Sequence, residues 1–155
     1  MEMNLFWPGK TRNKWIRGLE DEYLNKIRRM GHCSIVPTRE ARGLSEKEKG
    51  RILSTEAEGL LNHLDKGYVV CLSDKGRSMT SAGFAEFIKQ LHIGPHSCVS
   101  FVIGGYHGLE DSVLLKANTR LSLSKMTFSH EMTRVMLLEQ LYRSFSLIQG
   151  RKYAK

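Results

Sequence analysis

The sequence predicts an α/β domain with a mostly parallel sheet and helices on both of its faces. Short apolar runs typical of strands alternate along the chain with longer stretches of helical periodicity. Two of the runs, 68–72 and 98–103, are almost wholly apolar, as expected of parallel strands buried on both faces. The length of 155 residues suits a single domain with a sizeable core, so we expect residues 1–155 to form one unit.

The first half of the chain predicts two strands and two helices. A strand at 3–7 is closed by Pro8-Gly9, and a helix over 14–30 ends at Gly31. The strand at 33–36 is expected to stop at Pro37, and a polar, basic loop follows over 38–43. Ser45 and Glu48 form a capping box for a helix that ends before Gly67.

The second half continues the alternation. The strand at 68–72 leads into a predicted loop at 73–77, and Thr80 or Ser81 caps a helix that Gly94-Pro95 breaks. Further elements are the strand at 98–103, a short helix beginning at 110–111, a strand at 121–123, a helix over 130–149 and a basic tail at 151–155.

The composition favours a cytoplasmic protein with a polyanionic partner. The net charge is +8 and the sequence pI about 9.6, with basic residues spread over several segments rather than gathered in one tail. No apolar run approaches the ~20 residues that span a membrane, and the N-terminus lacks the pattern of a signal peptide. The three cysteines have no metal-ligand spacing, so we expect small buried side chains and no metal site.

A ligand site is predicted where the buried strands end. In an open α/β sheet, ligands bind at the carboxyl ends of the strands. Three ends carry suitable residues: Leu72-Ser73, Gly104-Gly105 and the turn 124–129. A glycine pair after a strand is equally typical of a tight turn. The pattern matches neither the dinucleotide fingerprint nor the phosphate-binding P-loop, because the glycine spacing and the ribose-binding acid are missing.

Three segments in the second half of the chain carry a family resemblance. They are FVIGGYHGL at 101–109, LSLSKMTFSH at 121–130, and Arg134-Val135 followed by EQLYR at 139–143. With Gly9-Lys10 after the first strand, they closely resemble the ribosomal RNA large-subunit methyltransferase H family. That family belongs to the SPOUT class of knotted methyltransferases. The resemblance extends over essentially the whole chain, and the C-terminal third is its most specific part.

The resemblance implies a C-terminal trefoil knot, a homodimer and S-adenosylmethionine as methyl donor, with no metal. It further implies methylation of N3 of a pseudouridine in the 23S RNA of the assembled ribosome. The donor-binding residues would lie at the same three strand ends: Leu72, Ser73, Gly104, Gly105, Ser124, Lys125, Met126, Thr127, Phe128 and Ser129.

Four residues are candidates for the chemistry of methyl transfer. Uracil N3 becomes a good nucleophile as its proton leaves, which requires a base or a group that stabilises the imide anion. His130 is the candidate base, Arg143 the anion-stabilising group and Tyr153 a residue that stacks on the target ring, while Glu139 would orient Arg143. The alternative is structural: His130 as a helix-terminal residue, and Glu139 with Arg143 as an ordinary helix-stabilising pair.

Three departures from the family pattern leave other interpretations open. His107 stands where relatives often have Glu or Asn, Ala154 replaces a tail histidine, and Pro8 is expected to shorten the first strand. The main alternative is a non-catalytic RNA- or ribosome-binding protein with the same fold. A nucleotide-dependent oxidoreductase is a third hypothesis, which the missing fingerprint disfavours. For the methyltransferase, the residues expected to contact RNA phosphates are Lys10, Arg12, Lys14, Arg151 and Lys152.

Overall fold

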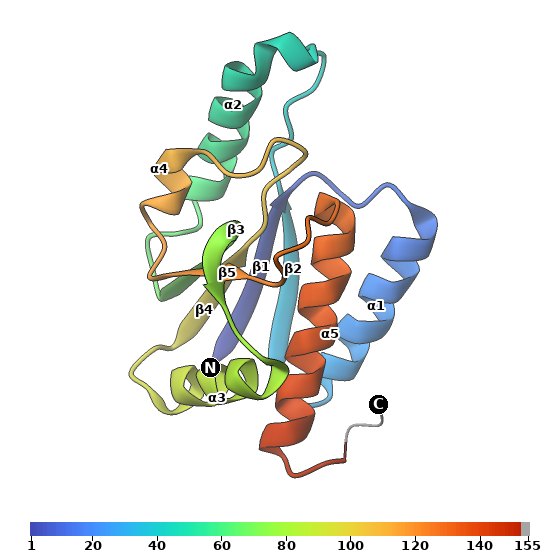
Figure 1. Ribbon diagram of the computed structural model, residues 1–155, viewed down its shortest axis with the longest axis vertical. Coiled ribbons are helices and arrows are strands. Elements are labelled where there is room, and N and C mark those ends of the chain that lie inside the picture. Colours follow the sequence, from blue (N-terminus) through green and yellow to red (C-terminus); the bar gives the residue numbers. More distant parts are fainter. Residues whose placement is uncertain (153–155) are drawn as a thin grey trace.

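The fold is known from a computed structural model, which describes residues 1–152. Five parallel strands form one sheet in the order β2-β1-β4-β3-β5 (Figure 1). The strands are β1 (Glu2–Pro8), β2 (His32–Thr38), β3 (Tyr68–Ser78), β4 (Cys98–Val102) and β5 (Thr119–Ser122). All pairings within this sheet are parallel, so the carboxyl ends of the strands share one edge, as the sequence predicts.

Helices cover both faces of the sheet. One face carries α1 (Lys14–Arg28), α3 (Ser81–Ile93) and α5 (His130–Ile148), with α1 and α3 both packed against α5 (Figure 1). The other face carries α2 (Lys49–Leu61), preceded by the short 3-10 helix η1 (Glu46–Glu48), and α4 (Asp111–Leu114). The predicted two-sided α/β arrangement is therefore confirmed.

Two hydrophobic cores lie on opposite sides of the sheet, because successive side chains of a strand point to opposite faces. In β1, Leu5 and Trp7 join the core under α1, α3 and α5, whereas Phe6 between them joins the core under α2 and α4. In β4, Phe101 joins the core under α1, α3 and α5, and Val102 joins the core under α2 and α4. This division explains the continuous apolar runs of these strands, since each residue of such a run meets a helix layer.

Polar side chains at the predicted positions start the helices. The Thr80 hydroxyl accepts a hydrogen bond from the backbone of Gly83 at 3.0 Å, which caps α3. The Ser45 backbone N–H donates to Glu48 Oε2 at 3.1 Å, as one half of the predicted capping box. Asn13 and Ser129 cap α1 and α5 in the same manner. Each cap satisfies backbone donors that the first helical turn leaves without partners.

One of the two prolines that were expected to end strands lies inside its strand. Pro8 is the last residue of β1 and pairs with Thr38, so the first strand closes at Pro8-Gly9 as predicted, whereas Pro37 lies within β2 opposite Trp7. The prediction that Pro37 stops the second strand is wrong, because β2 continues to Thr38. β2 is an edge strand, which tolerates a residue without an N–H, and the pairing of β1 with β4 ends at Phe6, before Pro8.

The predicted loop over 73–77 is also partly wrong, because β3 continues to Ser78. Its pairing with β5 shifts register between Leu72 and Arg77, which leaves residues 73–76 as an irregular segment inside the strand. The chain then pairs again, with Ser78 opposite Ser122. Gly76 passes so close to β5 that a Cβ there would lie 2.7 Å from backbone atoms of Arg120 and Leu121.

The cysteines follow their prediction only in part. Cys33 and Cys71 are buried, and burial raises the pKa of each thiol to about 12. Cys98, at the start of β4, is partly exposed, which corrects its expected burial. Within residues 1–152, no helix combines the length and the apolar character needed to cross a membrane.

We predict that Gly76→Ala destabilises the fold, because its methyl group would press on backbone that cannot move without breaking the β3–β5 pairing. The expected loss is about 1–3 kcal/mol in the free energy of unfolding, measured by urea denaturation. Gly50→Ala is the matched control, since a Cβ at this exposed position in α2 meets nothing within 4 Å. That change is expected to stabilise by about 0.5–1 kcal/mol. Equal effects of the two substitutions would contradict the close approach at Gly76.

Candidate active site

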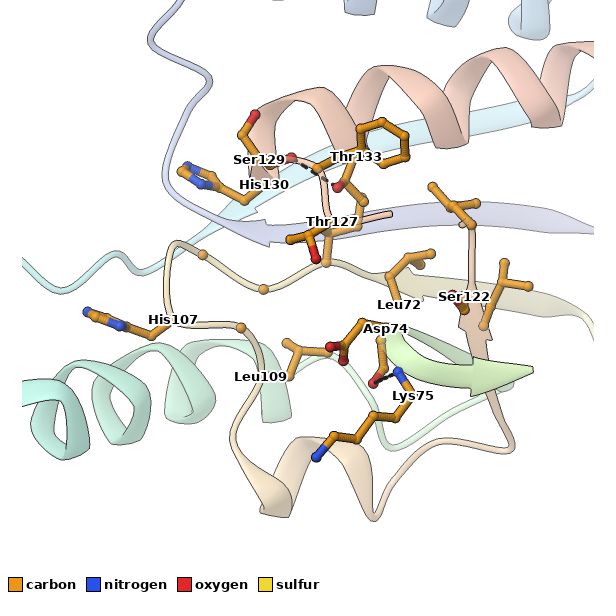
Figure 2. A pocket seen from close by; sticks show the side chains of 18 of the residues that line it. Leu72, Asp74, Lys75, His107, Leu109, Ser122, Thr127, Ser129, His130 and Thr133 are labelled. Carbon is orange, nitrogen blue, oxygen red and sulfur yellow. Dashed lines mark hydrogen bonds between the residues drawn. The ribbon is translucent and has the colours of Figure 1, made fainter. Parts of the chain in front are cut away.

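A cavity of about 800 Å³ opens at the carboxyl edge of the sheet, where β3, β4 and β5 end (Figure 2). Its walls are the segment after Leu72, the loop 103–109 and the turn 121–130, with Asp111 and Leu114 contributed by α4. Three chain segments that are far apart in sequence therefore meet around one space. The volume lies in the range of pockets that hold small molecules and cofactors.

The loop after β4 is folded tightly around glycines. The backbone N–H of Gly108 donates to the carbonyl of Gly105 at 3.0 Å, and Gly108 has a positive φ of 81°. At Gly104, a Cβ would lie 2.3 Å from the carbonyl carbon of Gly108, so no side chain fits there. The glycines thus fix the loop in a compact form that presents Tyr106 and His107 at the cavity.

The turn 122–130 forms the opposite wall and is held by its own hydroxyl groups. The Ser122 hydroxyl donates to the carbonyl of Ser124 at 2.9 Å, and the Ser124 hydroxyl accepts from the backbone of Met126 at 3.0 Å. The Thr133 hydroxyl donates to the carbonyl of Ser129 at 3.0 Å (Figure 2). These bonds explain why the turn is rich in small hydroxyl side chains.

The cavity unites nearly all of the residues predicted for donor binding. Lining it are Leu72, Ser73, Gly104, Gly105, Ser124, Met126, Thr127, Phe128 and Ser129, whereas Lys125 is not among the lining residues. Other lining residues were not singled out from the sequence: Asp74, Lys75, Leu109, Asp111, Leu114, Ser122 and Thr133. Asp74 and Lys75 directly follow a predicted strand end, so the rule that ligands bind at strand ends applies to them as well.

His130 lines the cavity from the first residue of α5 (Figure 2). Its pKa is lowered, first by partial burial and then by the positive charge of Arg134, with a smaller contribution from Arg12. The nearby carboxylates of Glu131 and Glu40 act in the opposite direction without reversing the shift. The imidazole is therefore neutral at pH 7 and has a ring nitrogen that can accept a proton.

Glu139 and Arg143 lie further along α5 and do not line the cavity. They form the predicted i,i+4 pair, with Arg143 Nη2 2.7 Å from Glu139 Oε1. At 1.5 Å per residue, Arg143 lies about 20 Å along the helix from His130. Tyr153, the fourth predicted catalytic residue, lies outside the described residues.

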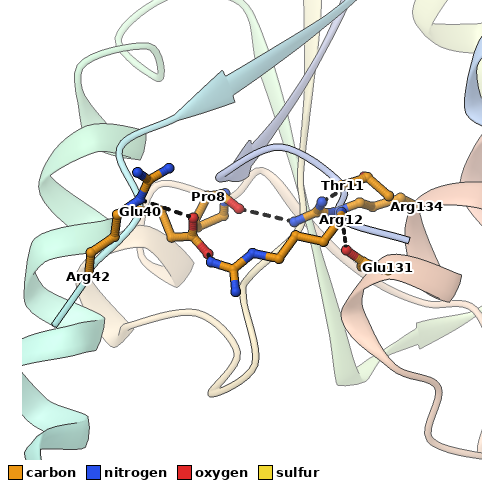
Figure 3. A network of polar contacts seen from close by, with 7 residues as sticks. All are labelled: Pro8, Thr11, Arg12, Glu40, Arg42, Glu131 and Arg134. Carbon is orange, nitrogen blue, oxygen red and sulfur yellow. Dashed lines mark hydrogen bonds and ion pairs between the residues drawn. The ribbon is translucent and has the colours of Figure 1, made fainter. Parts of the chain in front are cut away.

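A buried polar network supports the first turn of α5 and was not foreseen from the sequence. Arg134, only 1% exposed, donates to the Thr11 hydroxyl at 2.8 Å and to the carbonyl of Pro8 at 3.0 Å (Figure 3). The Thr11 hydroxyl in turn donates to Glu20 at 2.5 Å, and burial raises the pKa of that carboxyl group. The guanidinium of Arg134 also lies 4.9 Å from the ring centre of Trp7. The network fixes the segment 8–13 against α1 and α5.

Within the part of the chain that the structure describes, no three His, Cys, Asp or Glu side chains come together as metal ligands. The groups at the cavity are backbone amides, hydroxyls, the two carboxylates of Asp74 and Asp111, the ammonium of Lys75, two imidazoles and apolar side chains. Such a set suits an organic ligand with both polar and apolar parts.

Comparisons with known proteins identify the family of the chain. Residues 1–154 match a family model described as "Predicted SPOUT methyltransferase". The chain therefore belongs to the SPOUT methyltransferase family, and it is a methyltransferase.

Among its relatives are two proteins named "Ribosomal RNA large subunit methyltransferase H". The one from Clostridium botulinum (strain Kyoto / Type A2) is 36% identical over 159 residues, covering 100% of both chains. The one from Thermodesulfovibrio yellowstonii (strain ATCC 51303 / DSM 11347 / YP87) is 37% identical over 149 residues, covering 96% of this chain and 95% of the relative.

Solved structures share the fold at low sequence identity. A probable methylase family protein from Haemophilus influenzae Rd KW20 has a TM-score of 0.55 at 16% identity, over 99% of this chain and 70% of that one. The putative methyltransferase Lpg2936 from Legionella pneumophila, in complex with bound SAM, has a TM-score of 0.52 at 13% identity, over 91% of this chain and 65% of that one.

We predict that Arg134→Met lowers the free energy of unfolding by about 3–5 kcal/mol, because the Thr11 hydroxyl and the Pro8 carbonyl lose their donor and the buried Glu20 loses the nearby positive charge. Urea denaturation followed by circular dichroism measures this loss. Arg29→Met, at an exposed position after α1, is the control and should change stability by no more than about 0.5 kcal/mol. A neutral Arg134→Met would show that the network does not hold the segment 8–13.

Proposed function

We propose that this methyltransferase transfers the methyl group of S-adenosylmethionine to ribosomal RNA of the large subunit. The acceptor atom we propose is N3 of a pseudouridine in the 23S RNA of the assembled ribosome. The observation that carries the proposal is the cavity at the carboxyl edge, which is lined by two of the segments that resemble the methyltransferase H family, 101–109 and 121–130, and by the end of the strand at Leu72. Full-length relatives with that name, at 36–37% identity, support the choice of acceptor.

The residues of the cavity fit the donor. Leu72, Leu109 and Leu121 offer apolar walls for an adenine ring, and the backbone of the 104–108 loop is open to the edge of such a ring. Asp74 and Asp111 carry negative charge for the cationic sulfonium and ammonium groups, and Lys75 carries positive charge for the carboxylate. When bound, S-adenosylmethionine supplies an electrophilic methyl group. The protein's part is to position the acceptor nitrogen and to remove its proton.

His130 is the base that we assign to the acceptor. It lies at the cavity, and its lowered pKa keeps it neutral and ready to accept the N3 proton at physiological pH. The protonated imidazole that results is destabilised by Arg134 and Arg12, so it releases the proton readily to solvent after transfer. The place of His130 at the cavity and its neutral ring support the assignment as general base.

A homodimer accounts for the placement of Arg143 and Glu139. Because Arg143 lies about 20 Å along α5 from His130, we propose that the pair acts at the cavity of the partner subunit. Large apolar side chains are exposed on the neighbouring helices α1 and α5, as expected of a surface that a second copy covers. They are Trp15, Leu19, Met132, Leu147 and Ile148. Tyr153 keeps its proposed role of stacking on the target ring.

We further propose that the C-terminal segment forms the trefoil knot of the SPOUT class within one domain spanning residues 1–155. The close passage of Gly76 against β5 supports this threading, since chain segments that cross need a residue without a side chain. Activity on ribosomes would place the protein in the cytoplasm.

The direct test is transfer of labelled methyl from S-adenosylmethionine to ribosomes that lack the modification, with separate subunits and naked RNA assayed in parallel. We expect label on one pseudouridine of the large subunit, and only in assembled ribosomes. Donor binding without label on any of these RNAs would point to a different acceptor. Absence of both donor binding and label would favour the alternative of a non-catalytic RNA-binding protein.

We predict that methyl transfer declines as the pH falls through the pKa of His130, which lies below its ordinary value of about 6.5. Protonation removes the base, so the loss occurs on the acid side and the rate is level above it. His130→Gln should lower kcat by about 10²–10⁴-fold and abolish this acid limb. The control His92→Gln, at an exposed position of α3, should retain both the rate and the pH profile of methyl transfer. An acid limb that survives in His130→Gln would assign the base elsewhere.

A further inference from the structure

A second cavity, of about 700 Å³, lies at the same edge of the sheet beside β1 and β2, and we call it the basic cleft. Its lining residues are Gly9, Lys10, Thr11, Arg12, Arg17, Pro37, Thr38, Arg39, Glu40 and Arg42. Five of these are basic, against the single carboxylate of Glu40. An accumulation of this kind in a concave site attracts anions and raises their local concentration.

Glu40 arranges the arginines of the basic cleft. Its Oε1 lies 2.9 Å from Nη2 of Arg12, and its Oε2 lies 3.8 Å from Nε of Arg42 (Figure 3). The carboxylate packs so closely on Gly9 that a Cβ there would lie 2.6 Å from it. One anchored carboxylate therefore holds two guanidinium groups at neighbouring positions.

These ion pairs do little for stability. Arg39 forms a further pair, with its Nη1 3.8 Å from Oε2 of Glu58. The side chains of Arg12, Arg39 and Arg42 are 75%, 66% and 83% exposed, and pairs at such exposed sites contribute little to folding. Their guanidinium groups keep donors that are directed to solvent, and such donors match the oxygens of a phosphate. The arrangement is that of an open anion site with its cations already positioned.

The first turn of α5 contacts both the basic cleft and the active-site cavity. Glu131 accepts a hydrogen bond from the backbone N–H of Arg12 at 2.6 Å (Figure 3). It accepts another from the backbone N–H of Asn13 at 3.4 Å. The preceding residue, His130, lines the active-site cavity. The first turn of α5 therefore separates the two cavities, and a ligand that spans it reaches both.

We propose that the basic cleft binds backbone phosphates of the RNA strand next to the target nucleotide, so that the target base reaches His130. This inference rests on the proposed function and assigns Arg17, Arg39 and Arg42 to substrate binding, together with Lys10 and Arg12. Phosphate contacts position a nucleic acid without reading its sequence. The contacts would hold the strand while the base to be methylated occupies the neighbouring cavity.

The test measures the affinity of fluorescently labelled protein for assembled ribosomes that lack the modification, by anisotropy from about 50 to 200 mM salt. The variant is the double substitution Arg39→Ala and Arg42→Ala. We expect it to bind the ribosomes at least tenfold more weakly at low salt. Its slope of log K against log salt should fall by about 0.7–0.9 for each phosphate that the variant no longer neutralises. Unchanged donor affinity by calorimetry and an unchanged melting temperature would establish that the fold and the active-site cavity are intact.

The matched control is Lys66→Ala combined with Lys89→Ala, which removes the same charge from the amino-terminal end of the sheet. It should keep the wild-type salt slope after a small loss of affinity. Equal slopes for the two double variants would overturn the assignment, because general electrostatic attraction would then explain all binding. Displacement of the RNA by inorganic phosphate at low millimolar concentration would also overturn it, in favour of a small-anion site.

The outcome separates this inference from the proposed function. If wild-type protein methylates ribosomes and the cleft variant keeps the wild-type KM for ribosomes, the cleft assignment fails alone. If wild-type protein transfers no methyl group and the RNA affinity still depends on Arg39 and Arg42, the proposed function fails and the RNA-binding cleft is supported.

Discussion

The guanidinium of Arg134, almost without access to water, joins the last helix to the end of the first strand. A charge in this position is tolerated only with partners, and it finds them in Thr11, the carbonyl of Pro8 and the ring of Trp7. Because these partners allow few alternative arrangements, the segment 8–13 and the first turn of α5 are held in one relative position. The charge also lowers the pKa of His130, so one side chain links the packing of the domain to the proposed chemistry.

Two cavities follow from this constraint. The active-site cavity needs the turn 122–130 to end at His130, and the basic cleft needs Arg12 to lie beside Glu131. Both lie at the carboxyl edge of a parallel sheet, where strand ends converge and backbone amides are free to meet a ligand. The loop 104–108 forms one wall of the active-site cavity, and its glycines place backbone rather than side chains against the space. Methyl donor and RNA backbone would thus occupy adjacent sites separated by a single helical turn.

Local patterns predicted most of the fold and the position of the site, and long-range contacts account for what they missed. The apolar runs ending at Leu72 and Ile103 identified buried parallel strands, and from them the place of the cavity. Pro37 was wrongly expected to stop its strand, because the tolerance of a strand for proline depends on which neighbours the strand has, and no local pattern contains that. The bond between Arg134 and Pro8 spans 126 residues, so it leaves no trace in spacing. The distance along α5 between His130 and Arg143 follows from the sequence. Whether Arg143 reaches the cavity depends on where the cavity lies, which only the structure shows.

The proposed chemistry requires that the methyl donor binds in the cavity formed by the ends of β3, β4 and β5. A crystal structure of the chain grown with S-adenosylhomocysteine, the demethylated donor, tests it most directly. We expect one molecule per chain, enclosed by Leu72, Gly105 and Thr127, with its sulfur on the side of His130. A cavity that stays empty under saturating ligand, or a ligand found only in the basic cleft, would contradict the account.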